Sequence, residues 1–371
     1  MNCLLTGGTG IVGSHVIFDW LKQNISNNTQ EHLYVVIRDN TITAKERLVN
    51  ILNNNSKPDY LKAISIEKCL EKITVITEDL VTIKKEKLEA YNFSKIIHCA
   101  GSTNLSHATN SKTVVHEQNY LATHQLLENL PEAVNRFIYI STAYSFGIQN
   151  EVVNDSISKY NVDTFRNPYE QSKYETEKYV IEKCKDINIA SQILRPSIIC
   201  GRLIDKPFFE TPKFDVFYSW PMFLDKYSKK FTDAFRIWIH KESGLNIVPV
   251  DFVSKAILYA VEHPEIKELN IVNPEQVLHK DYVGKVLESF EISNYEYIDK
   301  MPLNLNSFEA IYYKTIGQLF ENYISIPDLQ FDAKRIKDII SQLKLETTLG
   351  VHENFMNLIN FSVEKKFKQS Y

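Results

Sequence analysis

The 371-residue sequence predicts an α/β fold in which a doubly wound parallel sheet is joined to a smaller, mostly helical lobe. Through the first 200 residues, short apolar runs alternate with segments of helical periodicity, which is the pattern of a parallel sheet covered on both faces. After residue 204 this alternation gives way to a stretch rich in aromatic residues and proline. We therefore expect a Rossmann-type domain over 1–204, to which 245–275 returns, and a substrate-binding lobe over 205–244 and 276–371.

The elements of the predicted sheet domain follow one another in a regular order. The strand candidates are short, mostly apolar runs rich in β-branched residues, namely 2–6, 33–37, 73–76, 95–99, 136–141 and 190–195. Helices are indicated where apolar residues recur every three or four positions, namely at 11–23, 44–53, 112–129, 168–185 and 252–261. Because ligands bind beyond the carboxyl ends of the strands in such sheets, we expect the functional site at that edge.

The turn after the first strand carries a glycine pattern that favours dinucleotide binding. Gly7, Gly10 and Gly13 form G-x-x-G-x-x-G between strand and helix. Glycine at these points permits a tight turn, close approach of the backbone to phosphate, and close packing of helix on strand. The helix N-terminus then offers N–H groups and a positive dipole end to a pyrophosphate. Three of only 11 glycines fall at this spacing, so an ordinary turn is the weaker interpretation.

The second strand ends at a cation. Arg38 stands where NAD-dependent enzymes usually carry an acidic residue for the adenosine ribose. A guanidinium suits a 2′-phosphate instead, because it can bind phosphate with two parallel hydrogen bonds. Arg47 either adds a second cation or lies on a solvated helix face. We therefore expect NADPH as the cofactor, although Asp39 argues in the other direction.

Composition excludes several other functions. The net charge is −4, so no basic surface argues for nucleic acid. The apolar runs are too short to span a bilayer, and the N-terminus has the pattern of a strand rather than a signal peptide. Five scattered cysteines fit reduced thiols, and ten histidines show no metal-ligand spacing. We expect a cytoplasmic protein without a metal site.

Residues 205–238 are rich in aromatic side chains and proline. Such a composition fits either the small core of a lobe with many loops or an apolar channel for a lipid-like chain. The sequence leaves both interpretations open.

A candidate catalytic set follows from three segments. The strand over 136–141 leads into the hydroxyls of Ser141 and Thr142, and the helix over 168–185 places Tyr169 and Lys173 on one face, four residues apart. A nearby lysine ammonium would stabilise a phenolate and lower the pKa of the tyrosine. A threonine hydroxyl can hydrogen-bond the substrate oxygen as charge develops there. We therefore predict Thr142, Tyr169 and Lys173 as catalytic residues.

Together these motifs resemble the short-chain dehydrogenase/reductase superfamily of the extended type, over about residues 1–275. Within it, the sequence is most similar to fatty acyl-CoA reductases and to the thioester reductase domains of carboxylic acid reductases and peptide synthetases, the male sterility-like family. The segments that carry this resemblance are Thr6–Gly13, Val36–Arg38, Glu46–Leu48, Asp79-Leu80, Ile97–Gly101, Asn119, Ile140–Tyr144, Tyr169 with Lys173, Leu194–Ile198 and Val248–Asp251.

The resemblance implies roles for individual residues. Arg38 and Arg47 would face the 2′-phosphate, Asn119 would support a water or backbone feature near Lys173, and Lys173 would also contact the nicotinamide ribose. The full set implied around the cofactor is Thr6, Gly7, Gly10, Ile11, Val12, Gly13, Arg38, Arg47, Asp79, Leu80, Cys99, Ala100, Gly101, Asn119, Lys173, Arg195, Pro196 and Ser197, with Asp79 and Leu80 along the adenine.

The implied reaction is the reduction of an acyl thioester by NADPH to an aldehyde or on to an alcohol. The thiol would be coenzyme A or the phosphopantetheine arm of a carrier protein. Two alternatives remain open: an NAD-dependent sugar-nucleotide epimerase, dehydratase or hydroxysteroid-type dehydrogenase, and a nucleotide-binding regulator without catalysis. Helices 112–129 and 168–185 are candidates for pairing across a homodimer.

Overall fold

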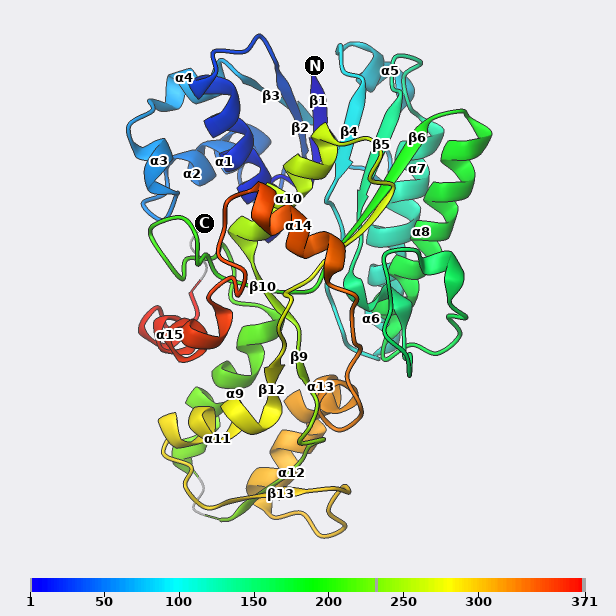
Figure 1. The fold of residues 1–371 in the computed structure, drawn as a ribbon. Coiled ribbons are helices and arrows are strands. Elements are labelled where there is room, and N and C mark those ends of the chain that lie inside the picture. The colour runs from blue at the N-terminus through cyan, green and yellow to red at the C-terminus, as the bar shows by residue number, and fades with distance from the viewer. Residues whose placement is uncertain (1, 231–232, 369–371) are drawn as a thin grey trace.

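A seven-stranded parallel sheet forms the centre of the upper lobe in Figure 1. The structure, a computed structural model, describes residues 2–230 and 233–368. The strand order is β11-β6-β5-β4-β1-β2-β3, and every pair is parallel. The strands are β1 Cys3–Thr6, β2 Leu33–Ile37, β3 Ile73–Thr77, β4 Lys95–His98, β5 Arg136–Ile140, β6 Ala190–Pro196 and β11 Glu268–Ile271. The predicted doubly wound sheet and its six predicted strands are therefore confirmed.

Helices cover both faces of this sheet because successive strand residues point to opposite sides. Leu5 belongs to the apolar core under one set of helices, and Leu4 belongs to the core under the other set. The first set is α1 Ile11–Ser26, α2 Ala44–Asn53 and α10 Val250–Glu262, with the short helices α3 Asp59–Lys62 and α4 Ile66–Leu70 beside it. The second set is α5 Lys85–Glu89, α7 Ala122–Glu128 and α8 Pro168–Asp186.

The predicted helix 112–129 is interrupted in its middle. It begins as α6 Thr109–Val115, widens into the π-helix His116–Leu121, and continues as α7. A π-helical turn holds an extra residue, which alters the direction of the side chains around it, and such turns are frequent at functional sites. Here the turn contains Asn119, which is buried. The interruption therefore bears on the site described below.

The smaller lobe lies beyond the carboxyl ends of the strands (Figure 1). It is built from helices and three two-stranded pairs, β7–β10, β9–β12 and β8–β13. Its strands are β7 Ile198–Cys200, β8 Phe235–Trp238, β9 Gly244–Leu245, β10 Ile247–Pro249, β12 Val277–Leu278 and β13 Tyr295–Ile298. Its helices are α9 Ser219–Tyr227, α11 His279–Ser289, α12 Ser307–Lys314, α13 Ile316–Ile324 and α15 Val351–Glu364, while α14 Lys334–Gln342 lies on the sheet lobe. Short 3-10 turns occupy Ala143–Phe146, Ile157–Lys159, Val216–Tyr218 and Ser228–Lys230.

The two parts of the chain are linked more closely than the sequence indicates. Strand β11, in the segment 245–275, pairs with β6 at the edge of the main sheet. Helix α14 comes from the predicted lobe segment 276–371 but packs against β11. One apolar cluster runs from α1 through α10 into α15. The division into domains stays a prediction, and its parts at 231–232 and 369–371 lie outside the described residues.

Candidate active site

The glycine turn after β1 has the geometry of an anion cradle. Gly7 has a φ of +70°, and the Gly10 N–H donates to the Gly7 carbonyl over 2.9 Å. A Cβ on Gly13 would stand 2.2 Å from the Gly7 oxygen, so only glycine lets helix α1 start this close to the turn. Helix α1 begins at Ile11 with no side-chain cap on its first turn. The N-terminus of α1 therefore presents backbone N–H groups suited to a phosphate.

A chain of buried hydrogen bonds joins this turn to the next loop. The Thr6 hydroxyl lies 2.7 Å from His98 Nδ1 and accepts the Ala100 N–H over 3.3 Å. His98 Nε2 lies 2.8 Å from the Thr123 hydroxyl, which donates to the Asn119 carbonyl over 2.6 Å. Because the Thr123 proton is used there, His98 must donate from Nε2 and accept from Thr6 at Nδ1. Burial lowers the pKa of His98 to about 3, so the ring is neutral, and this neutral chain fixes the loop at Ala100.

Two arginines meet at the predicted adenosine end. Arg38 Nη1 lies 3.6 Å from Asp79 Oδ2, and both side chains are about half exposed. Arg47 donates from Nη1 to the Arg38 carbonyl over 2.8 Å and from Nη2 to the Thr9 hydroxyl over 2.9 Å. Burial, together with the charge of Arg38, lowers the pKa of Arg47. Arg47 therefore bridges the end of β2 and the glycine turn, where two cations are available to an anion.

The three predicted catalytic side chains line one cavity. Thr142 follows strand β5, and Tyr169 lies in the first turn of α8, whose N-cap Asn167 accepts the Glu170 N–H over 3.0 Å. Lys173 follows one turn later and donates to the Ile140 carbonyl over 2.7 Å. Its ammonium also stands 4.4 Å from the centre of the Tyr139 ring. Burial lowers the pKa of Lys173 to about 8.

The expected effect of Lys173 on Tyr169 is wrong for this structure. Burial raises the pKa of Tyr169, and the hydrogen bond with Thr142 opposes this rise only in part. The lysine does not lower it, because its ammonium is directed at the Ile140 carbonyl and the Tyr139 ring. At neutral pH the phenol of Tyr169 is consequently protonated, and it can donate a proton rather than accept one.

Asn119 connects the π-helical turn with the loop after β4 and with the catalytic helix. Its Oδ1 accepts the Ser102 N–H over 2.7 Å, and its Nδ2 donates to the Ser102 carbonyl over 3.2 Å and to the Ser172 hydroxyl over 2.9 Å. A Cβ on Gly101 would stand 2.8 Å from Asn119 Oδ1, which explains glycine at that position. Asn119 thus positions the loop beside the residue that precedes Lys173.

The prediction that Arg195 lies at the cofactor needs a correction, because its side chain does not line the cavity. The buried guanidinium donates to Glu177 from Nε and Nη2 over 2.8–3.1 Å and to Glu268 over 2.6 Å. It also donates to the Asp155 carbonyl over 2.8 Å. A buried charge requires such partners, and here they tie β6 to α8 and to β11. Its neighbours Pro196 and Ser197 do line the cavity.

The cavity has a volume of about 370 Å³ and extends from the glycine turn into the smaller lobe. The predicted site residues that line it are Gly7, Gly10, Ile11, Val12, Gly13, Cys99, Gly101, Thr142, Tyr169, Lys173, Pro196 and Ser197. Thr6, Ala100, Asn119 and Arg195 act from behind its wall, while Arg38, Arg47, Asp79 and the half-buried Leu80 lie toward the adenosine end.

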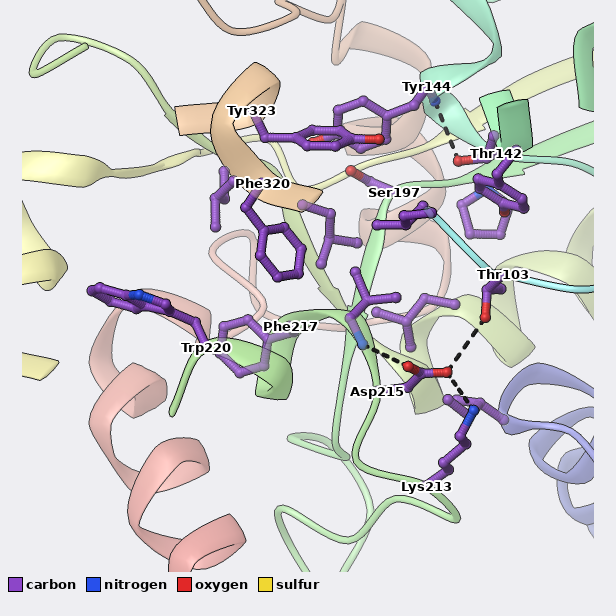
Figure 2. A pocket seen from close by; sticks show the side chains of 18 of the residues that line it. Thr103, Thr142, Tyr144, Ser197, Lys213, Asp215, Phe217, Trp220, Phe320 and Tyr323 are labelled. Carbon is purple, nitrogen blue, oxygen red and sulfur yellow. Dashed lines mark hydrogen bonds and ion pairs between the residues drawn. The ribbon is translucent and has the colours of Figure 1, made fainter. Parts of the chain in front are cut away.

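Beyond Thr142, Tyr169 and Lys173 the cavity becomes an apolar chamber. Aromatic side chains from several lobe elements point into it, as Figure 2 shows for Phe217, Trp220, Phe320 and Tyr323. The aromatic composition of 205–238 signalled the first two. The chamber residues that sequence reasoning missed come mainly from the helices α11–α13 and α15 and from Tyr144, namely Tyr144, Tyr282, Val283, Val286, Tyr312, Phe320, Tyr323, Ile324, Phe355 and Ile359. Their positions depend on helix packing, for which the sequence carried no local signal.

Helix α13 of the chamber is attached to the catalytic helix next to Tyr169. The Tyr323 hydroxyl donates to Glu170 Oε1 over 2.7 Å and accepts from Asn167 Nδ2 over 2.6 Å. Glu170 is fully buried and also accepts the Arg166 N–H over 3.0 Å. The Tyr323 ring meets Tyr144 edge-on, with 5.5 Å between ring centres. This contact fixes one wall of the chamber relative to the catalytic tyrosine.

Among residues 2–230 and 233–368, no group of three or more His, Cys, Asp or Glu side chains is arranged to hold a metal ion. None of the helices in those ranges has the length and apolar character needed to cross a membrane.

The glycine turn at the switch point of the sheet, with Thr142, Tyr169 and Lys173 around the adjoining cavity, is the arrangement that the resemblance to the extended short-chain dehydrogenase/reductase superfamily implied. Residues 5–257 match the family described as male sterility protein, and the chain belongs to this family. The expected resemblance is confirmed.

Two solved structures of reductase domains share the fold. One is a thiolation-reductase di-domain from an archaeal non-ribosomal peptide synthetase, with a TM-score of 0.67, 18% identity, and coverage of 99% of this chain and 91% of that chain. The other is the terminal R domain from the myxalamid PKS-NRPS biosynthetic pathway, with a TM-score of 0.67, 17% identity, and coverage of 98% and 91%.

Curated relatives point to sugar-nucleotide enzymes. The dTDP-D-glucose 4,6-dehydratase of Dictyostelium discoideum is 26% identical over 53% of this chain and 44% of its own length. The UDP-glucose 4-epimerase of Erwinia amylovora is 28% identical over 40% of this chain and 38% of its own length. The chain thus spans less than half of these relatives. The fold is also similar to the UDP-glucuronic acid 4-epimerase of Bacillus cereus, at a TM-score of 0.64 and 18% identity over 98% of this chain and all of that one.

Proposed function

We propose that the protein is an NADPH-dependent reductase of acyl thioesters, with an aldehyde as its first product. The observation that carries this proposal is the apolar chamber that opens directly from Thr142 and Tyr169. A thioester carbonyl held between these two hydroxyls would place its acyl chain among the aromatic side chains of the lobe. Apolar lining with a few placed polar groups is the usual character of a site for such a ligand.

The roles of the residues follow from their protonation. Bound NADPH would supply a hydride to the carbonyl carbon. The Tyr169 phenol, which burial keeps protonated, would donate a proton to the carbonyl oxygen while the Thr142 hydroxyl steadies the developing charge. The resulting hemithioacetal loses its thiol as the carbon–sulfur bond breaks and the carbonyl forms again, which yields the aldehyde. A second reduction of this aldehyde would give the alcohol.

The cofactor proposal rests on Arg38 and Arg47. Arg47 holds the Arg38 carbonyl and Thr9 and so brings a second guanidinium to the end of β2. A pair of cations there favours the 2′-phosphate of NADPH over the free ribose hydroxyl of NADH. Asp79 pairs with Arg38 at 3.6 Å, and a phosphate would compete with this carboxylate for the arginine.

The second candidate is an NAD-dependent epimerase or dehydratase acting on a sugar nucleotide. Its support is the similarity to the dehydratase and the epimerase named above. The chamber argues against it, because a sugar and its diphosphate require many hydrogen-bonding groups. The inner wall is instead formed by residues such as Trp220, Val286 and Phe355.

The deciding experiment measures NADPH oxidation with a panel of acyl-CoA thioesters and acylated carrier proteins, together with the aldehyde or alcohol formed. The Tyr169→Phe variant serves as the inactive control, and Tyr174→Phe on the same helix serves as the matched control. Turnover that needs a thioester and Tyr169 supports the proposal. Conversion of UDP-glucose or dTDP-glucose with NAD, and no reduction of any thioester, would replace it with the second candidate.

A further inference from the structure

A second, polar hollow adjoins the catalytic cavity on the side of the loop that follows β4. It lies between the loop residues 101–105, the lobe segment 213–216 and helix α13. The two spaces share part of their walls, including Thr103, Lys213, Asp215 and Phe320. The hollow therefore adjoins the cavity along these residues.

The lining of this hollow differs from that of the chamber. Hydrogen-bonding side chains surround it, namely Ser102, Thr103, Asn104, Gln118 and Ser219. The chamber, by contrast, is mainly aromatic and aliphatic. A ligand that fills both spaces and reacts beside Tyr169 therefore needs a polar, hydrogen-bonding arm, an apolar tail and a reacting group.

One cation stands at the polar end. Lys213 is the positively charged residue among the described residues that line the hollow, and its side chain is half exposed. Its ammonium lies 2.6 Å from Asp215 Oδ2, which also accepts the Thr103 hydroxyl over 3.4 Å (Figure 2). Asp215 Oδ1 accepts the Val216 N–H over 3.0 Å. Asp215 thus orients the lysine, whose ammonium has three donors and can serve a further acceptor.

We propose that Lys213 binds the phosphate of a phosphopantetheine arm that enters through this hollow. The inference rests on the proposed reduction of thioesters and names the recognition element of that substrate. A phosphopantetheine thioester has a phosphate at one end, two amides and a hydroxyl along its length, and the acyl group at the other end. These parts have counterparts in the cation, the polar hollow, the proposed catalytic residues and the apolar chamber. Coenzyme A and carrier proteins share this arm.

The test compares substrates that differ only in the phosphate. The same acyl group is presented as the thioester of pantetheine and of 4′-phosphopantetheine, to the wild type and to Lys213→Ala. We expect the substitution to raise KM about tenfold or more for the phosphorylated substrate, which is the loss of one charge-assisted hydrogen bond. KM for the pantetheine thioester and for NADPH should stay the same. Lys213→Arg should retain most of the effect, and Lys337→Ala, on the exposed side of α14, is the matched control.

Two results overturn the inference. Equal increases in KM for both thioesters would give Lys213 a structural role, and an increased KM for NADPH would assign its charge to the cofactor. Binding of free 4′-phosphopantetheine and pantetheine, measured by calorimetry on the NADP-loaded protein, separates this inference from the proposed function. Tighter binding of the phosphorylated compound that is lost in Lys213→Ala keeps the site even if no thioester is reduced. Equal binding of the two compounds would refute the phosphate site at Lys213, even if the protein reduces thioesters.

Acyl-CoA and an acylated carrier protein as further substrates identify the source of the arm. Both should lose affinity in Lys213→Ala, since both carry the phosphate, and the one with the higher kcat/KM is the preferred carrier. No loss with either of them contradicts the proposal.

Discussion

Removing the Tyr323 hydroxyl is expected to loosen the smaller lobe from the catalytic helix. In Tyr323→Phe, Glu170 loses the donor at 2.7 Å and Asn167 loses its acceptor at 2.6 Å, while the aromatic ring stays in place. Glu170 is fully buried, so water cannot readily replace the lost partner. A hydrogen bond to a charged group contributes about 1.5–3 kcal/mol. Because the Arg166 N–H still serves Glu170, we expect a loss near the lower end, about 2 kcal/mol.

Urea unfolding followed by circular dichroism measures this change. Tyr295→Phe is the matched control, because its phenol donates over 3.2 Å to Glu288 at an exposed position, where the expected effect is below about 1 kcal/mol. A loss below about 0.5 kcal/mol in Tyr323→Phe, or the same loss in both variants, would refute the reasoning. Since α13 also carries Phe320 and Ile324 into the chamber wall, KM for the acyl substrate should rise in Tyr323→Phe and stay constant in the control.

Four further predictions concern the residues on the cofactor side of the cavity. Gly13→Ala places a Cβ 2.2 Å from the Gly7 carbonyl oxygen, so NADPH binding measured by fluorescence should weaken at least about tenfold; unchanged binding would show that the turn can shift at no cost. Arg38→Ala should lower the ratio of kcat/KM for NADPH over NADH about 10- to 100-fold, and an unchanged ratio would argue against a 2′-phosphate at this point. Burial lowers the pKa of Lys173 from 10.5 to about 8, so the ammonium expected to contact the nicotinamide ribose is lost as the pH rises through 8, and kcat/KM should fall there. Lys173→Arg, where it retains activity, should lack this limb of the pH profile. The same pKa shift lowers the free energy of unfolding at neutral pH, because the unfolded chain binds this proton more tightly than the folded protein does. This destabilisation is fully present below pH 8 and fades between pH 8 and 10.5. Over that range the unfolding free energy of the wild type should therefore rise relative to that of Lys173→Met.

Sequence reasoning was reliable where the signal was local. The six strands of the first 200 residues were found because each is a short apolar run between turns. The glycine turn was found because the φ of +70° at Gly7 and the contact at Gly13 restrict those positions to glycine. Tyr169 and Lys173 were placed on one helix face because their spacing of four residues determines it.

Sequence reasoning was unreliable where the hydrogen-bond or ion-pair partner of a side chain comes from a distant part of the chain. Arg195 pairs with Glu177 and Glu268, which lie 18 and 73 residues away, and those contacts turn its side chain away from the cavity. Lys173 is directed by the Ile140 carbonyl, 33 residues away, and not by the neighbouring tyrosine. The widening of the helix at His116–Leu121 was also missed, because a π-helical turn keeps the composition of an ordinary helix.

By itself, the sequence determined the fold class, the glycine turn after β1 and the choice of Thr142, Tyr169 and Lys173 as candidate catalytic side chains. These properties depend on periodicity, glycine stereochemistry and spacing within one helix, all of which act over a few residues. Only the tertiary structure decided which buried groups meet, how burial sets their pKa values, and that helices from the end of the chain close an apolar chamber beside Tyr169. These properties depend on long-range packing, because burial and charge pairing arise only when segments far apart in the sequence come together.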